Sequence, residues 1–194
     1  CTLVDFDEKS CEMKIPESYN FFDYGLDLYA PQSTLDKEGR RTVIAWLRMP
    51  EPMDSGAIGM YCTPRICEVR NIYFRPHPDV KNKFTRKTAV PEKIYMIKAS
   101  LSEGEKIDAG GFSVQRKNGR IVTDRSKVIR AHGELKSVCE TPELKDGFDV
   151  EIYIDENMAE VFVNGGEYVI TNAVYDLTNN VSSDGNIEIY ALEG

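Results

Sequence analysis

The chain has 194 residues, of which 41% are hydrophobic and 29% are charged, and its net charge is −8. This composition is typical of one globular domain, or of one domain with an appendage. No run is apolar over the roughly 18 to 20 positions that a membrane span requires, and phosphate backbones repel an acidic chain. We therefore expect neither a membrane nor a nucleic acid as a partner.

The cysteines and histidines form no pattern typical of a metal site. The five cysteines lack the spacing of a disulfide framework or a zinc knuckle, and His77 and His132 lie far apart in the sequence. Free thiols favour a reducing compartment. We therefore expect a cytoplasmic protein with no metal and no cofactor.

The first element along the chain that can be predicted is a β-hairpin over residues 29–46. Residues 36–39 supply its turn, and an apolar run from Thr42 to Trp46 comes next. Residues 75–87 are rich in Pro and Lys and poor in apolar side chains, which is typical of a connector. The part before this connector is too small to close a core alone. It must pack on the second half of the chain, or on something that this chain does not contain.

Strand patterns continue through the second half. Residues 94–101 and 186–192 are predicted strands, and residues 111–124 form a predicted hairpin that turns at Asn118-Gly119. In residues 148–155 apolar and polar side chains alternate, so one face should pack on a core and the other, which includes Tyr153, should face water.

A further hairpin is predicted around Asn164-Gly165-Gly166, where residues 159–163 and 167–170 should pair antiparallel. No stretch of about ten residues has a helical period. The chain is therefore all-β, and its second half suggests an antiparallel β-sandwich. We expect the core of this sandwich to include Val150, Ile152, Ile154, Val161, Val163 and Ile189.

Two longer runs resemble motifs of a known enzyme family. Residues 23–32 read Asp-Tyr-Gly-Leu-Asp-Leu-Tyr-Ala-Pro-Gln, continue through Gly39-Arg40-Arg41 to Trp46, and are followed at residues 59–65 by Gly-Met-Tyr-Cys-Thr-Pro-Arg. Residues 150–155 read Val-Glu-Ile-Tyr-Ile-Asp, and residues 159–167 read Ala-Glu-Val-Phe-Val-Asn-Gly-Gly-Glu. In order and spacing these runs resemble motifs of glycoside hydrolase family 32, the invertases, levanases and sucrose-6-phosphate hydrolases.

The resemblance implies an all-β fold in which a C-terminal antiparallel β-sandwich is preceded by the last part of a five-bladed β-propeller. Residues 1–78 would be the end of the catalytic propeller domain, with its last blade incomplete. Residues 79–89 would be the connector and residues 90–194 the sandwich. The missing N-terminal propeller would then be a partner of this chain.

The chain lacks the motifs that hold the catalytic residues of the family. It has no W-M-N-D-P-N-G motif with a nucleophilic Asp, no R-D-P motif, and no E-C motif with an acid/base Glu. A retaining glycosidase needs two carboxyl groups about 5 to 5.5 Å apart. The resemblance therefore implies a C-terminal fragment of a β-fructofuranosidase acting on sucrose, sucrose-6-phosphate or fructans, with no catalytic residue of its own and no activity when isolated.

Four residues are candidates for binding the sugar substrate: Trp46, Tyr29, Asp23 and Asp27. Trp46 either forms an apolar wall of a sugar pocket, on which a sugar face stacks, or fills the core of a blade. Tyr29 is either a core residue or a hydrogen-bonding group at the pocket rim. Asp23 and Asp27 can point the same way from one strand face, either toward water at an edge or toward sugar hydroxyls.

Two other functions stay open from the sequence. The chain could be a non-catalytic carbohydrate-binding sandwich, or a structural module that supports a propeller or mediates dimers. An incomplete blade leaves a strand edge unpaired, and such an edge recruits other strands. We therefore expect a homodimer through this edge.

Overall fold

The computed structural model describes residues 1–17, 19–50, 60–68, 72–129 and 135–193, with the backbone alone described at 60–64 and 68. Its regular structure consists of strands and one short helix, α1 (Pro78–Lys81). The prediction of an all-β chain is confirmed. Within the described residues no helix has the length and apolar character needed to cross a membrane.

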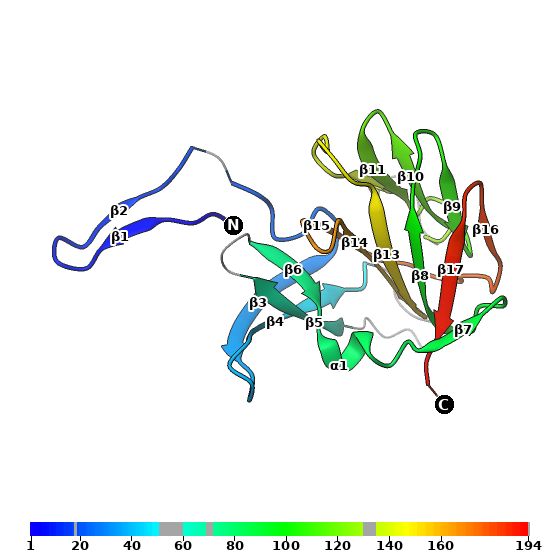
Figure 1. Cartoon of the computed structure of the whole chain (residues 1–194), viewed down its shortest axis with the longest axis horizontal. Coiled ribbons are helices and arrows are strands. Elements are labelled where there is room, and N and C mark those ends of the chain that lie inside the picture. The colour runs from blue at the N-terminus through cyan, green and yellow to red at the C-terminus, as the bar shows by residue number, and fades with distance from the viewer. Residues whose placement is uncertain (18, 51–59, 69–71, 130–134, 194) are drawn as a thin grey trace.

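Two antiparallel sheets form a sandwich in the second half of the chain (Figure 1). The five-stranded sheet has the order β12 (Val138–Glu140), β11 (Arg120–Asp124), β10 (Phe112–Lys117), β9 (Lys106–Ala109) and β16 (Val181–Ser183). The six-stranded sheet has the order β15 (Tyr168–Ala173), β14 (Met158–Val163), β13 (Asp149–Asp155), β8 (Ile94–Ser100), β17 (Ile187–Ala191) and β7 (Arg86–Thr88). The predicted hairpins β10–β11 and β14–β15 are both confirmed by their pairing.

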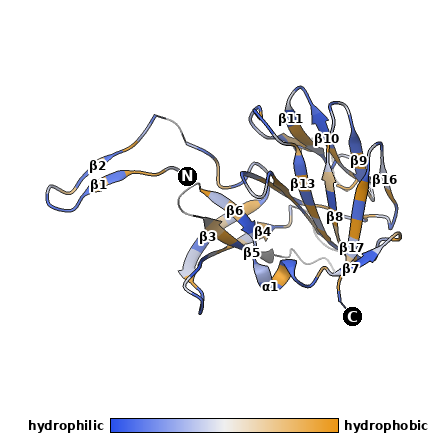
Figure 2. Cartoon of the chain, viewed as in Figure 1, coloured by the Kyte–Doolittle hydropathy of each residue, from blue (hydrophilic) through white to orange (hydrophobic). Residues whose placement is uncertain are grey.

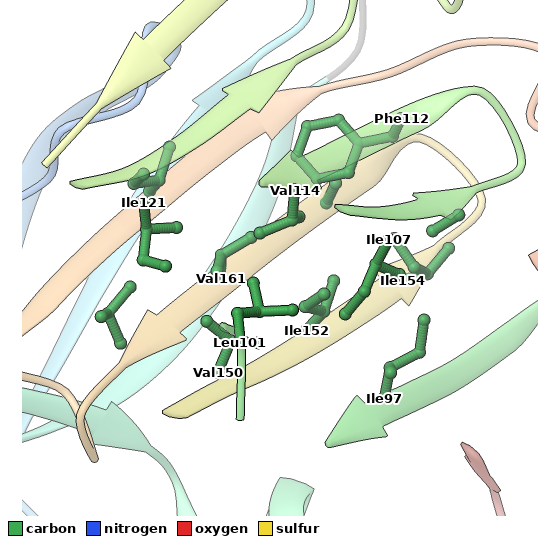
Figure 3. Packing of buried hydrophobic residues seen from close by; sticks show 14 of the residues in the cluster. Ile97, Leu101, Ile107, Phe112, Val114, Ile121, Val150, Ile152, Ile154 and Val161 are labelled. Atoms are coloured by element: carbon green, nitrogen blue, oxygen red, sulfur yellow. The ribbon is translucent and has the colours of Figure 1, made fainter. Parts of the chain in front are cut away.

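The core of the sandwich lies between these two sheets. Figure 3 shows side chains of the six-stranded sheet, such as Ile152 and Val161, facing those of the five-stranded sheet, such as Ile107 and Val114. The residues predicted for this core are all buried: Val150, Ile152, Ile154, Val161, Val163 and Ile189. Alternation with a period of two therefore identified the core-facing residues correctly.

A four-stranded antiparallel sheet forms a third layer. Its order is β3 (Leu28–Leu35), β4 (Arg41–Arg48), β5 (Met60–Glu68) and β6 (Tyr73–Pro76). Val43 and Phe74 of this sheet pack with Phe162 and Val169 on the outside of the six-stranded sheet. The six-stranded sheet is thus the middle layer, and the first part of the chain leans on the sandwich as predicted.

The prediction that Tyr153 faces water is wrong. Tyr153 is buried and makes edge-to-face ring contacts with Phe84 and Phe162. The alternation identified the two faces of β13 correctly, but the four-stranded sheet and the segment after α1 cover the face that was expected to be solvated.

The first strands lie apart from these layers. The hairpin of β1 (Asp5–Asp7) and β2 (Glu12–Lys14) projects from the body of the molecule (Figure 1). Its tip is hydrophilic (Figure 2), whereas Phe6 and Met13, which face each other across the hairpin, are both more than half exposed. An isolated two-stranded hairpin is marginally stable in water. The exposed side chains of Phe6 and Met13 offer apolar surface through which a further contact could stabilise this hairpin.

The segment predicted as a connector contains structure of its own. Residues 79–89 include most of α1 and all of β7, which pairs with β17 at the edge of the sandwich. The segment therefore connects the four-stranded sheet to the sandwich and also adds an edge strand to the six-stranded sheet. The division at residues 78 and 90 stays a prediction.

Candidate functional site: an exposed aromatic face and a buried domain junction

The face of the four-stranded sheet that points away from the sandwich carries exposed aromatic rings. On β4, Val43, Ala45 and Leu47 are buried against the sandwich, so the alternate residues Ile44, Trp46 and Arg48 point outward. Tyr29 of β3 is the register partner of Trp46. We call Tyr29, Ile44, Trp46 and Arg48 the outer face.

The outer face combines apolar surface with hydrogen-bonding groups. Trp46 is 42% exposed and Tyr29 55% exposed, and the guanidinium carbon of Arg48 lies 5.2 Å from the centre of the Tyr29 ring. Adjacent rings with a phenol and a guanidinium at their margin can stack on a sugar and hydrogen-bond its hydroxyls. The same face can also pack against another sheet.

Asp23 lies on the opposite side, inside the junction between the four-stranded sheet and the sandwich. Its Oδ2 accepts a hydrogen bond from Nη2 of Arg65 at 2.6 Å and one from the Thr171 hydroxyl at 2.7 Å, while its Oδ1 accepts the backbone N–H of Thr171 at 2.9 Å. Arg65 is completely buried and donates through Nε to Glu160 of β14 at 2.7 Å. One arginine of β5 thus joins the carboxylate of Asp23, in the segment before β3, to the carboxylate of Glu160 in the middle layer.

The surroundings of Arg65 keep it charged. Burial alone lowers the pKa of this guanidinium, but the carboxylates of Glu160 and Asp23 together raise it above its ordinary value. The rings of Phe22 and Phe162 lie over it, with centres 5.2 and 5.8 Å from the guanidinium carbon. Arg65 is thus a buried cation that pairs with two carboxylates and lies against two aromatic rings.

Asp27 occupies a second buried ion pair at the same junction. Its Oδ2 pairs with Arg125, which lies just after β11, and accepts the backbone N–H of Ala173 at 2.9 Å. Arg125 also donates to the carbonyls of Ala173 and Lys136. Burial raises the pKa of Asp27, and the charge of Arg125 opposes that rise.

The candidate sugar-binding residues therefore fall into two groups. Tyr29 and Trp46 lie side by side on the outer face, whereas Asp23 and Asp27 lie in the buried junction. The alternative that the two aspartates face water at an edge is wrong, because the three layers enclose both carboxylates. Sugar binding by any of the four residues stays a prediction.

A groove of about 350 Å³ opens at another part of the junction, beside α1. Phe162 and Ile66 contribute apolar surface to it, and Arg40, Lys81 and Glu151 contribute charge. These charges are largely paired, since Lys81 contacts Glu151 at 2.7 Å and Arg40 contacts Asp36 at 2.6 Å. None of the candidate sugar-binding residues lines this groove.

A metal site is not evident in the part of the chain that the structure describes, because no three His, Cys, Asp or Glu side chains there are placed to share an ion. His132, Gly59 and the side chains of residues 60–64 lie outside the described residues. Of the short motif at residues 59–65, only the Arg65 side chain can therefore be placed.

Two family models match this sequence. Residues 66–194 match the C-terminal model of the glycosyl hydrolases of family 32, and residues 1–76 match the N-terminal domain model of that family. The chain belongs to glycoside hydrolase family 32. The resemblance inferred from its motifs is confirmed.

Curated relatives of this family 32 chain are much longer than it is. A sucrose-6-phosphate hydrolase of Vibrio alginolyticus is 26% identical over 195 residues, which cover 89% of this chain and 40% of the relative. A raffinose invertase of Escherichia coli is 25% identical over 200 residues, which cover 89% of this chain and 41% of the relative. The chain thus spans about 40% of the length of these relatives.

Solved structures of family 32 share the fold of this chain. A family 32 glycoside hydrolase of Bifidobacterium adolescentis superposes with a TM-score of 0.75 at 23% identity, covering 98% of this chain and 35% of that one. A sucrose-6-phosphate hydrolase of Lactobacillus gasseri superposes with a TM-score of 0.70 at 19% identity, covering 89% and 42% of the two chains. This likeness confirms the predicted fold class, a β-sandwich preceded by part of a β-propeller.

Sequence reasoning did not identify the junction residues Arg65, Glu160 and Arg125. One signal was available for Glu160, a single charged residue within the apolar run 159–163. A charge in such a strand requires a buried partner. The sequence alone does not show which of its 24 Lys and Arg residues supplies that partner.

Proposed function

We propose that this chain is the C-terminal part of a β-fructofuranosidase that hydrolyses sucrose, sucrose-6-phosphate or fructans. The matches to both domain models of family 32 support this proposal. The curated relatives that are named sucrose-6-phosphate hydrolases and a raffinose invertase support the substrate class. Free cysteines, including the buried Cys139, support the cytoplasm as its compartment.

The catalytic carboxyl groups would come from propeller strands that this chain does not contain. A retaining mechanism requires a nucleophile and an acid/base about 5 to 5.5 Å apart with the substrate between them. Asp23, Asp27 and Glu160 are unsuited to these roles, because each is buried in an ion pair with an arginine. The isolated chain is therefore inactive in this proposal.

The chain would contribute part of the sugar site through its outer face. The observation that carries this step is the pair of exposed aromatic residues, Tyr29 and Trp46, at one register position of β3 and β4. A furanose or pyranose ring can stack on the indole, while the phenol hydroxyl and the Arg48 guanidinium offer hydrogen bonds at its margin.

Hydrolysis assays test this proposal in two steps. The purified chain, freed of host invertase, should release no fructose from sucrose or sucrose-6-phosphate. In an active assembly that supplies the propeller, Trp46→Ala should lower kcat/KM by roughly ten- to a hundredfold, because one stacking wall contributes about 1 to 3 kcal/mol. Val138→Ala, at an equally exposed position on β12 of the sandwich, should change it little. Turnover by the chain alone, or full activity of Trp46→Ala, would contradict the proposal.

The outer strand of the four-stranded sheet supports a second, structural role. Within the described residues β3 pairs only with β4, so its other edge has no strand beside it. We infer that the isolated chain forms homodimers through this edge, where the propeller would otherwise pack. Sedimentation velocity over a hundredfold range of concentration tests this inference, and a monomer throughout that range would refute it.

A further inference from the structure

Residues 23–27 cover the open edge of the middle sheet. Within the described residues β15 is an outer strand of that sheet and pairs only with β14. On its other side the N–H groups of Thr171 and Ala173 donate to Asp23 and Asp27, each at 2.9 Å, and the carbonyl of Val169 accepts the N–H of Tyr24 at 2.8 Å. Three backbone groups on the outer edge of β15 are thus satisfied by one short segment.

Gly25 allows this segment to approach β15 closely. A Cβ atom at Gly25 would lie 1.8 Å from the carbonyl oxygen of Thr171, a distance that no side chain tolerates. A backbone that lies against another strand in this way needs glycine at the point of contact. The spacing Asp-Tyr-Gly-Leu-Asp therefore places two carboxylates on alternate N–H groups of β15, with the glycine between them.

Each aspartate is also tied to a different layer. Asp23 pairs with Arg65 of the four-stranded sheet, and Asp27 pairs with Arg125, which lies just after a strand of the five-stranded sheet. Both arginines are almost fully buried, and both reach β15, through the Thr171 hydroxyl and the Ala173 carbonyl respectively. All three layers meet at this segment, which we call the clasp.

The clasp continues directly into the outer face. The carbonyl of Asp27 accepts the N–H of Arg48 at 3.0 Å, which joins the start of β3 to the end of β4. Tyr29 comes two residues later and is the register partner of Trp46. A displacement of Asp27 would therefore shift both aromatic residues together.

We propose that Asp27 is a positioning residue, which with Asp23 holds the strand pair carrying Tyr29 and Trp46 in a fixed orientation on the sandwich. The proposal deepens the proposed function, on which it rests for the role of the two rings in sugar binding. The sandwich then supports the orientation of the sugar-binding residues and makes no contact with the sugar itself. Asp27 acts through the strand pair, because its carboxylate is enclosed on the side of β3 and β4 that faces the sandwich.

Trp46 reports on this coupling without any substrate, because it is the only tryptophan of the chain. In the 194-residue chain, Asp27→Asn should raise acrylamide quenching of Trp46 about twofold and speed amide exchange in β3 and β4 by about tenfold or more, at a temperature where circular dichroism shows the variant folded. Glu188→Gln, which removes a surface ion pair with Lys87, is the matched control and should leave both at wild-type values.

Two measurements cover the case in which Asp27→Asn does not fold. Arg125→Lys keeps the charge but not the planar set of donors, and it should give the same changes in smaller degree. In the wild type, the amides of Thr171 and Ala173 should exchange as slowly as those of β14. Fast exchange at these two amides, or a folded variant with wild-type Trp46 quenching, would overturn the proposal.

Sugar binding separates this proposal from the proposed function. In an active assembly, Asp27→Asn should lower kcat/KM by about tenfold together with the change at Trp46. Loss of activity with an unchanged Trp46 would instead mean that Asp27 contacts the sugar, and would overturn the positioning role. If neither the wild-type assembly nor the variant assembly binds sugar, the proposed function is refuted. The quenching and exchange measurements would still test whether the clasp positions Tyr29 and Trp46.

Discussion

Removal of the Arg65 side chain should destabilise the chain more than most single substitutions. In Arg65→Met the carboxylates of Asp23 and Glu160 stay buried with no cation between them. Breaking a buried ion pair from one side costs about 3 to 5 kcal/mol. For a chain of this length each kcal/mol lowers the melting temperature by about 2 to 4 °C, so the expected loss is about 6 to 20 °C.

Urea unfolding at neutral pH measures this effect. Far-UV circular dichroism monitors the sandwich, and Trp46 fluorescence monitors the four-stranded sheet, so the two probes together show whether the layers still unfold as one unit. Lys87→Met is the control, since its ion pair with Glu188 lies in solvent, and its stability should stay close to that of the wild type.

A triple variant tests the reason for the loss. Arg65→Met combined with Asp23→Asn and Glu160→Gln removes all three charges, while the amide oxygen at position 23 can still accept the Thr171 N–H. Because Nη1 of Arg65 has no partner among the described residues, the wild-type cluster is itself costly to bury, and the triple variant should recover more than half of the lost stability. A single variant within about 1 kcal/mol of the wild type, or a triple variant no better than the single one, would refute the buried-charge argument.

Three further substitutions have defined outcomes. Leu47→Ala, which empties a fully buried site against the sandwich, should cost about 2 to 5 kcal/mol in urea unfolding. The pKa of the Glu103 carboxyl is held below its usual value, chiefly because the carboxylate accepts the backbone N–H of Asn118. This interaction stabilises the fold above the unfolded-state pKa, and the stabilisation is lost as the pH falls through the folded-state pKa. Glu103→Gln should therefore be less stable than the wild type at pH 7 and equally stable in acid. Gly166→Ala would bring a Cβ atom to 2.3 Å from a carbonyl of β6 and should destabilise more than Gly165→Ala, which has the same sign of φ and open space around it; equal melting temperatures would contradict this.

Local patterns predicted most of the strands in the second half. The hairpin at Asn164-Gly165-Gly166 was predicted because Asn and Gly adopt positive φ readily, and the structure has φ angles of +50°, +66° and +100° at these three residues. The shorter strands, such as β9, β12 and β16, were not predicted. Runs of three or four residues carry too little periodicity to be recognised.

The candidate site was predicted in part. Period-two alternation did not decide whether Tyr29 and Trp46 lie in the core or at the surface, because another layer can cover either face of a strand. The structure exposes both rings on the same face. Asp23 and Asp27 were recognised as a pair, but their partners Arg65 and Arg125 lie 42 and 98 residues away in the sequence. Nothing local to the aspartates indicates those partners.

The sequence by itself determined most of the longer strands, the sandwich with its core residues, the membership of family 32 and the absence of that family's catalytic motifs from this chain. Each of these depends on local order, on the alternation of side chains, the turn residues and the motif letters. Only the tertiary structure decided that the middle sheet is covered on both faces, that Tyr153 and Glu160 are buried, and that two aspartates join three layers. Alternation specifies which side chains share a face, whereas what covers that face depends on contacts between residues far apart in the chain.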